Sequence, residues 1–163
     1  MRGLLAVICV TLLASCGFQM RGSYSLPWET LYISLPENDE VFRQLKRGIE
    51  TSTATRIVDD PKQAQASLMV LHNDHGKSIL SISAKARVRE VQLTRSIVYR
   101  LQDAAGKELA PTGNIIVQRD MSFNEGVTLA KEAEESLILR EMQSDMVQQL
   151  LRRLAAVKPL PAN

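Results

Sequence analysis

The longest periodic pattern in this chain lies at its carboxy-terminal end and predicts one long amphipathic helix. Apolar residues recur there every three or four positions, which predicts a helix over residues 127–156. Pro159 and Pro161 follow this segment and end the helix. A shorter pattern of the same kind predicts a second helix over residues 39–52, with Asn38 as its N-cap.

Other segments have the alternating or continuously apolar patterns that are typical of strands. Residues 30–35 alternate apolar and polar positions and predict a first strand. Further strands are expected at residues 56–58, 67–72, 78–102 and 114–123, and one helical turn is expected at residues 61–66.

The turn chemistry between these segments completes the predicted fold. Asn73-Asp74-His75-Gly76 has the composition of a hairpin turn, and residues 103–106 predict another turn. The element order is then strand, helix, several antiparallel strands and helix. This order predicts an α/β (α+β) sandwich, in which two helices pack on one face of a roughly four-stranded, mostly antiparallel sheet.

The amino terminus has the features of an export signal. Arg2 precedes ten mainly apolar residues, 4–13, and this run is too short for a spanning helix, which needs about 20. Leu13-Ala14-Ser15-Cys16-Gly17 follows and resembles the lipobox of bacterial lipoproteins. Cys16 is therefore the predicted lipidation site. The alternative is an ordinary secretory leader in which this cysteine occurs by chance.

These features divide the chain into a signal peptide (1–15), a lipidated tether (16–29), a single globular domain (30–157) and a tail (158–163). Bacterial lipoproteins that this chain resembles carry two or three acyl chains, which makes their attachment to a membrane stable. In the enterobacterial sorting rule, Asp after the lipidated cysteine retains a lipoprotein in the inner membrane. Gly17 stands there, so the resemblance implies the outer membrane, with the domain on its periplasmic side.

Composition excludes some functions and does not specify one. The formal net charge is +2 and aromatic residues make up 4% of the chain, so neither a general basic surface nor a stacking platform for nucleic acid is expected. Cys9 lies in the leader and would be removed with it. No internal disulfide is then possible, and the domain must be held together by its core.

A basic cluster lies within residues 84–101. Lys85, Arg87 and Arg89 share one face of a strand with the mainly apolar positions that follow them. In one interpretation, the apolar part faces the core and the basic part overhangs into solvent. In the other, the three cations also contact anionic groups such as phosphates, which arginine binds by paired hydrogen bonds. The two interpretations are compatible.

No sequence feature indicates an enzyme. A Gly-rich phosphate loop, a GxSxG motif and a CxxC motif are all absent from the sequence. His72 and His75 could hold a metal, but histidines in a turn are usually solvated. We therefore expect no catalytic residues, no metal site and no cofactor.

Three segments resemble the LptE family of LPS-assembly lipoproteins. The first is Cys16–Gly22 (CGFQMRG), the second is Leu129–Glu135 (LAKEAEE) after Phe123-Asn124, and the third is the strand Glu90–Leu93. The family typically opens with Cys-Gly-aromatic-x-Leu-Arg-Gly, and Met20 replaces the usual leucine here. The resemblance spans about residues 16–154.

The resemblance implies an outer-membrane lipoprotein that plugs an LptD-like β-barrel, helps this barrel to assemble and binds lipopolysaccharide. Lys131 matches a lysine at the start of the family's last helix, and the family's other basic position falls near Lys85 to Arg87. The candidate lipopolysaccharide-binding residues are therefore Lys85, Arg87, Arg89 and Lys131. The alternative is a periplasm-facing envelope lipoprotein that acts as an adaptor or a lipid carrier.

Overall fold

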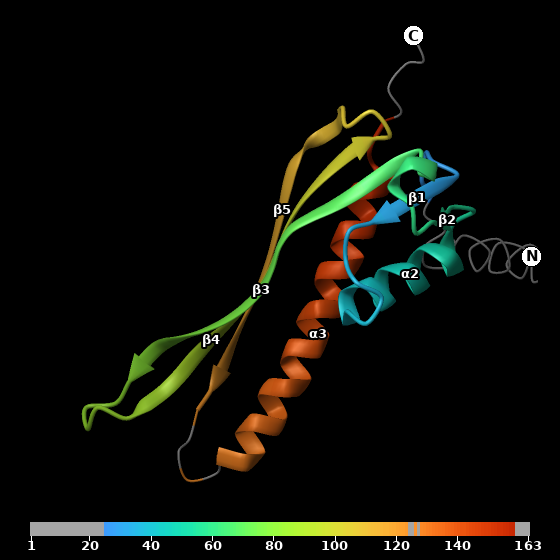
Figure 1. Ribbon diagram of the computed structural model, residues 1–163. Coiled ribbons are helices and arrows are strands. Elements are labelled where there is room, and N and C mark those ends of the chain that lie inside the picture. The colour runs from blue at the N-terminus through green and yellow to red at the C-terminus, as the bar shows by residue number, and fades with distance from the viewer. Residues whose placement is uncertain (1–24, 124–125, 127, 159–163) are drawn as a thin grey trace, which may run out of the picture.

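The computed structural model describes residues 25–123, 126 and 128–158, and Figure 1 shows a twisted sheet with two helices along one side. The helices are α2 (Glu40–Ser52) and α3 (Thr128–Ala155), and η1 (Pro61–Gln63) is a single 3-10 turn. The strands are β1 (Thr30–Ile33), β2 (Arg56–Ile57), β3 (Ala66–Ile82), β4 (Val88–Asp103) and β5 (Glu108–Ser122).

The sheet is mixed, with strand order β2-β1-β3-β4-β5. β1 is parallel to both of its neighbours, whereas β3, β4 and β5 form an antiparallel meander. β1 pairs only with residues 66–68 of β3, so the sheet narrows to three strands along the rest of the meander. The α+β fold is confirmed. The sheet has five strands rather than about four, because the two-residue strand β2 joins its edge.

The core lies between the wide part of the sheet and the two helices. The inward positions of β4 between Val91 and Leu101 are buried, apart from a half-buried arginine, which confirms that this face of the strand packs under the helices. Their helical partners are the apolar stripe of α2 and the second half of α3, where Met142, Met146 and Leu150 are fully buried. Burial of such side chains contributes about 1.5–3 kcal/mol each.

The core also includes Leu26 and Trp28, which precede the first strand. Both are 8% exposed. The packed part of the chain therefore begins before residue 30, within the segment that was expected to be a tether. The signal in the sequence is the pair of large apolar residues two positions apart, which a solvated linker would not need.

The hairpin turn predicted at Asn73–Gly76 is wrong. These residues lie inside β3 and pair with residues 94–97 of β4. The turn is instead at residues 83–87, where the backbone N–H of Ser83 donates to the carbonyl of Arg87 over 2.7 Å. All four residues pair with β4 in an uninterrupted stretch of the ladder from His72 to Ile79, and this pairing outweighs the local turn preference of the Asn-Asp-His-Gly sequence.

The N-cap of α2 is Asp39 and not Asn38. The Oδ1 atom of Asp39 accepts hydrogen bonds from the backbone N–H groups of Val41 and Phe42, over 2.7 and 3.3 Å. The Asp39 side chain thereby satisfies two of the unpaired donors at the start of the helix.

α3 has two unlike halves. Every residue between Leu129 and Glu141 is exposed or only partly buried, and fully buried side chains begin at Met142. The first half runs beside the narrow part of the sheet, beyond the reach of α2 (Figure 1). None of the helices in the described part of the chain is long and apolar enough to cross a membrane.

Candidate functional site

The basic tip, which we define as Lys85, Arg87 and Arg89, lies at the far end of the β3–β4 hairpin. All three side chains are exposed. Among the residues that the structure describes, no carboxylate forms an ion pair with any of them. The sequence therefore predicted correctly that the basic end of this segment overhangs into solvent.

The backbone of the turn holds the basic tip in a defined shape. The Arg87 N–H donates to the Ser83 hydroxyl oxygen over 3.1 Å, and the Ala86 N–H donates to the Ser83 carbonyl over 2.9 Å. Ala86 has φ of 55°, in the left-handed region that residues other than glycine rarely adopt. The two flanking cations, Lys85 and Arg87, are thus fixed on either side of a tightly specified residue.

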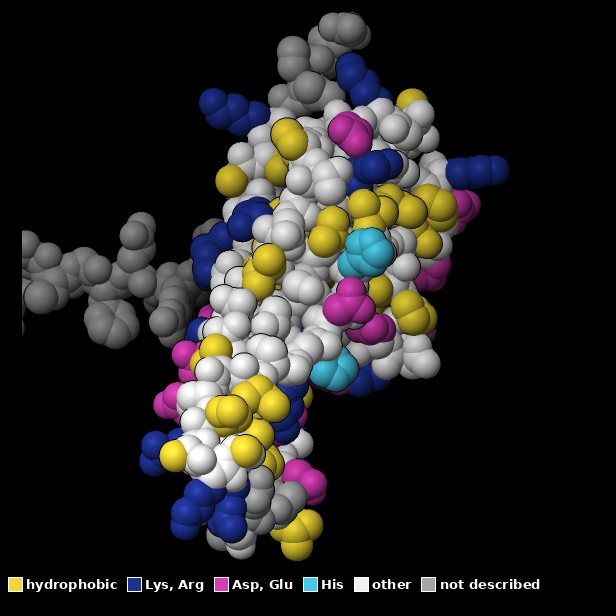
Figure 2. Space-filling model, turned by 90° about the vertical axis from the view of Figure 1, so that its left-hand side faces the viewer, with side chains coloured by type: hydrophobic (Ala, Val, Ile, Leu, Met, Phe, Trp, Pro, Cys, Tyr) yellow, Lys and Arg dark blue, Asp and Glu magenta, His cyan; other side chains and the backbone are white. Residues whose placement is uncertain are grey.

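Exposed apolar side chains lie next to the basic tip. Ile79, Leu80 and Ile82, at the end of β3, are 61%, 46% and 60% exposed. Figure 2 shows hydrophobic side chains gathered near this end of the molecule, with lysine and arginine side chains among them. The apolar neighbours of the tip were expected on β4, but those residues are buried. The exposed apolar surface comes from β3.

Lys131 lies at the same end but in a different environment. Its side chain is only 16% exposed, and its Nζ donates to Glu134 Oε2 over 2.8 Å and to the Ser122 hydroxyl over 3.1 Å. Phe123, which follows Ser122, donates its backbone N–H to the carbonyl of Arg89 over 2.7 Å. Lys131 therefore joins α3 to the base of the basic tip, and its charge is already partly compensated.

A second contact also joins α3 to the hairpin. Lys77 on β3 pairs with Glu135, and its Nζ lies 5.4 Å from the centre of the Phe123 ring. Two acidic residues near the start of α3, Glu134 and Glu135, thus pair with lysines on the side of the helix that faces the hairpin.

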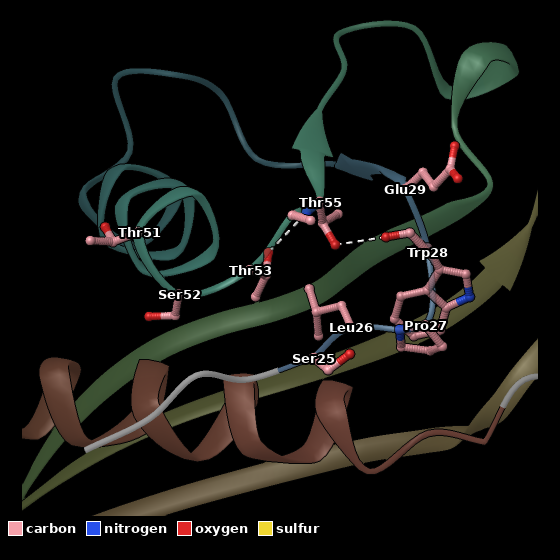
Figure 3. A pocket seen from close by; sticks show the side chains of 10 residues that line it. Ser25, Leu26, Pro27, Trp28, Glu29, Thr51, Ser52, Thr53 and Thr55 are labelled. Carbon is pink, nitrogen blue, oxygen red and sulfur yellow. Dashed lines mark hydrogen bonds between the residues drawn. The ribbon is translucent and has the colours of Figure 1, made fainter. Parts of the chain in front are cut away.

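A cavity of about 480 Å³ lies where the amino-terminal segment enters the fold (Figure 3). Residues 25–29 and 51–55 line it, and Glu29 is the one ionisable side chain among them. The Thr55 hydroxyl donates to the Trp28 carbonyl over 2.7 Å, and the Thr55 N–H donates to the Thr53 hydroxyl over 3.1 Å. Five serine and threonine side chains line the cavity beside Glu29, and Leu26 and Trp28 attach this segment to the core.

The two histidines do not form a metal site. His72 pairs with Val98 and His75 pairs with Arg95, positions whose side chains point to opposite faces of the sheet. No group of three or more histidine, cysteine, aspartate or glutamate side chains that could hold a metal occurs in the described part of the chain. Cys16, the predicted lipidation site, lies outside the described residues.

Comparison with known proteins gives a consistent result along the chain. The family model described as "LptE: Lipopolysaccharide-assembly" matches residues 28–154. The chain is 26% identical over 153 residues to the LPS-assembly lipoprotein LptE of Pectobacterium atrosepticum, covering 92% of this chain and 82% of that protein. It is 28% identical over 158 residues to the protein of the same name from Yersinia enterocolitica, covering 94% of this chain and 75% of that protein.

Solved structures of lipoproteins have the same fold. The solution structure of an uncharacterized lipoprotein B from Nitrosomonas europaea matches with a TM-score of 0.74 and 37% identity, over 86% of this chain and 91% of that one. The crystal structure of the rare lipoprotein B from Shewanella oneidensis matches with a TM-score of 0.67 and 24% identity, over 78% of this chain and 94% of that one. The second similarity supports the fold alone.

Proposed function

Because this chain belongs to the LptE family of lipopolysaccharide-assembly lipoproteins, we propose that its basic tip binds lipopolysaccharide as it passes to the outer leaflet of the outer membrane. The observation that carries this proposal is the pairing of three cations with exposed apolar side chains at one end of the molecule. Lipopolysaccharide has phosphate groups on its sugars and acyl chains beside them. A surface with cations next to apolar side chains matches both parts of such a molecule.

The charges of the basic tip are available to a ligand. Lys85, Arg87 and Arg89 form no ion pair with the described residues, so a phosphate does not have to displace a carboxylate from them. Arginine binds phosphate through two parallel hydrogen bonds, each stronger than a neutral one. Lys131 is assigned a smaller part, because a ligand would compete with Glu134 for its ammonium group.

We also propose that the chain is anchored to the outer membrane by lipid on Cys16 and that it plugs the lumen of an LptD-like barrel. The lumen of a large barrel is polar, so a plug needs side chains that form hydrogen bonds. The outward face of the meander has such side chains: Gln92 donates to Asp120 over 3.1 Å and accepts from Gln118 over 3.2 Å. In Figure 2 a largely white strip, made of uncharged polar side chains and backbone, runs through the middle of the molecule.

Charge reversal at the basic tip tests the proposed binding surface. Lys85→Glu, Arg87→Glu and Arg89→Glu together should weaken the binding of purified lipopolysaccharide at least about tenfold, since two or three charge-assisted hydrogen bonds are lost. The fold should be retained, because exposed charge changes usually alter stability by less than about 0.5 kcal/mol. Titration calorimetry of the detergent-solubilised protein measures the affinity, and circular dichroism measures the fold.

The matched control is Arg56→Glu, Lys62→Glu and Arg152→Glu, which makes the same change in net charge at three exposed positions away from the tip. This control should bind lipopolysaccharide nearly as well as the natural protein does. Equal losses of lipopolysaccharide affinity in both triple variants would show a general effect of charge and would contradict the proposed site. Unchanged affinity in the tip variant would also refute it.

A further inference from the structure

We propose that a cavity between α2, α3 and the sheet binds a phosphate ester through Arg95 and Arg140. The cavity has a volume of about 320 Å³ and is lined by Glu40, His75, Arg95, Leu139, Arg140 and Gln143. Arg95 lies in the middle of β4, six residues from Arg89, which corresponds to about 20 Å along a strand. The cavity is therefore separate from the basic tip.

Arg95 has an unmet need for a hydrogen-bond acceptor. Its Nη2 donates to the side-chain oxygen of Gln143 over 3.1 Å, but its Nε is buried and has no partner among the described residues. Burial lowers the pKa of the guanidinium group, and the negative charges of Asp39 and Asp74 act in the opposite direction. A buried donor without a partner is costly, so this position indicates an acceptor supplied from outside the chain.

Two more donors face the same cavity. Arg140 is exposed on α3 and forms no ion pair within the described residues, and His75 lies directly opposite Arg95 across the β3–β4 ladder. Two guanidinium groups match the charge of a phosphate ester, about −1.5 to −2, better than that of a single carboxylate. Their planar arrays of N–H donors also suit phosphate oxygens.

The acidic residues near the cavity are engaged elsewhere. Glu40 accepts a hydrogen bond from Arg43, and this bond lowers the pKa of the Glu40 carboxyl group. The Oε1 atom of Glu40 also lies 3.8 Å from Nη2 of Arg47. The Asp39 carboxylate caps α2. Asp74 neighbours His75 on β3, so its side chain points to the opposite face of the sheet. None of these three carboxylates forms an ion pair with Arg95 or Arg140.

The size of the cavity suits a small ligand. A volume of about 320 Å³ is at the lower end of the range for ligand pockets, about 300–1,000 Å³, and exceeds what one phosphate needs. The remaining space, with Leu139 as an apolar wall, fits a group the size of a monosaccharide. The phosphate could be free or could belong to a sugar, and the experiment separates these sources. This site does not depend on lipopolysaccharide binding at the basic tip.

The test uses the full chain in detergent, titrated with inorganic phosphate and, separately, with glucose 1-phosphate. Arg140→Gln should weaken the binding of whichever probe binds more tightly by about tenfold, the effect of losing one charge-assisted contact. Arg152→Gln is the matched control, because it removes an exposed arginine from the same helix outside the cavity, and it should leave the affinity unchanged. Arg95→Lys keeps the charge but removes Nε and should also weaken binding.

The outcomes separate the possibilities. Tighter binding of glucose 1-phosphate than of inorganic phosphate supports a sugar phosphate as the ligand, and equal affinities support phosphate alone. The triple variant of the basic tip should bind both probes as the natural protein does, even if it loses lipopolysaccharide. The proposal is overturned if neither probe binds saturably, or if Arg140→Gln and Arg152→Gln bind equally well in proteins with unchanged circular dichroism.

Discussion

Gly76 and Gly106 both have open space where a Cβ atom would lie, and they differ in backbone conformation. Gly106 has φ of +80° in the β4–β5 turn, where Asp103 Oδ1 accepts hydrogen bonds from the N–H groups of Ala105 and Lys107. Gly76 lies within β3, paired with Thr94, and has no positive φ. The two positions therefore isolate the effect of conformation from the effect of crowding.

Substitution by alanine should have opposite effects at these positions. Gly106→Ala should destabilise the protein by about 1–2 kcal/mol, the cost of a left-handed conformation for a residue with a Cβ atom. Gly76→Ala should be neutral or stabilise it by up to about 1 kcal/mol, because alanine reduces the conformational entropy of the unfolded chain. Urea unfolding of each variant measures the change. Equal destabilisation by both substitutions would contradict this account.

At the scale of elements, α3 is one continuous helix with an unequal distribution of packing. Met142 is fully buried, whereas Leu137, five residues earlier on the same helix, is 50% exposed. Met142→Ala should cost about 2–5 kcal/mol, because it removes buried methylenes and leaves a cavity. Leu137→Ala should cost less than about 1 kcal/mol. Thermal and urea unfolding check both values, and similar costs for the two substitutions would show that the first half of α3 is packed as tightly as the second.

The elements with strong periodicity could be predicted from the sequence. The apolar stripe of α2 and the alternation along β4 depend on spacing alone, and both are buried as expected. The stripe of α3 also continues along the whole helix, but Leu129 and Leu137 are exposed because the sheet narrows beside them and α2 does not reach them. Periodicity identifies the face of a helix and does not show where its packing partner ends.

The candidate site was predicted only in part. The exposure of Lys85, Arg87 and Arg89 was predicted correctly, but Lys85 and Arg87 lie in the turn at residues 83–87 and not on one strand face with Arg89. The contact of Lys131 with Ser122 depends on how distant segments pack, and so does the cavity that Arg95 and Arg140 both line. The prediction of a turn at Asn73–Gly76 was wrong because it rested on local residue preferences alone. Pairing of these residues with β4 keeps them in a strand. Contacts between residues far apart in sequence are not specified by local patterns.

At the scale of the whole molecule, the two ends differ in construction. The wide end has five strands, both helices and the core, and the incoming amino-terminal segment attaches there through Leu26 and Trp28. In the described part of the chain, the narrow end consists of the meander and the first half of α3, and it bears the basic tip (Figure 1). A chain anchored by lipid near the wide end would thus hold its basic tip at a distance from the anchor.

This arrangement gives the last prediction, which concerns the assembled protein. When the full-length protein is purified from detergent-extracted outer membranes, a large β-barrel should be recovered with it in equal amounts, because a plug fills one lumen. Mass spectrometry of the same sample should show a mature chain that starts at Cys16 and carries acyl chains on it. One acyl chain would bind a membrane only weakly, at about 0.8 kcal/mol per buried methylene, so at least two are expected. Recovery as a free monomer would contradict the plug, and an unmodified Cys16 would contradict the anchor.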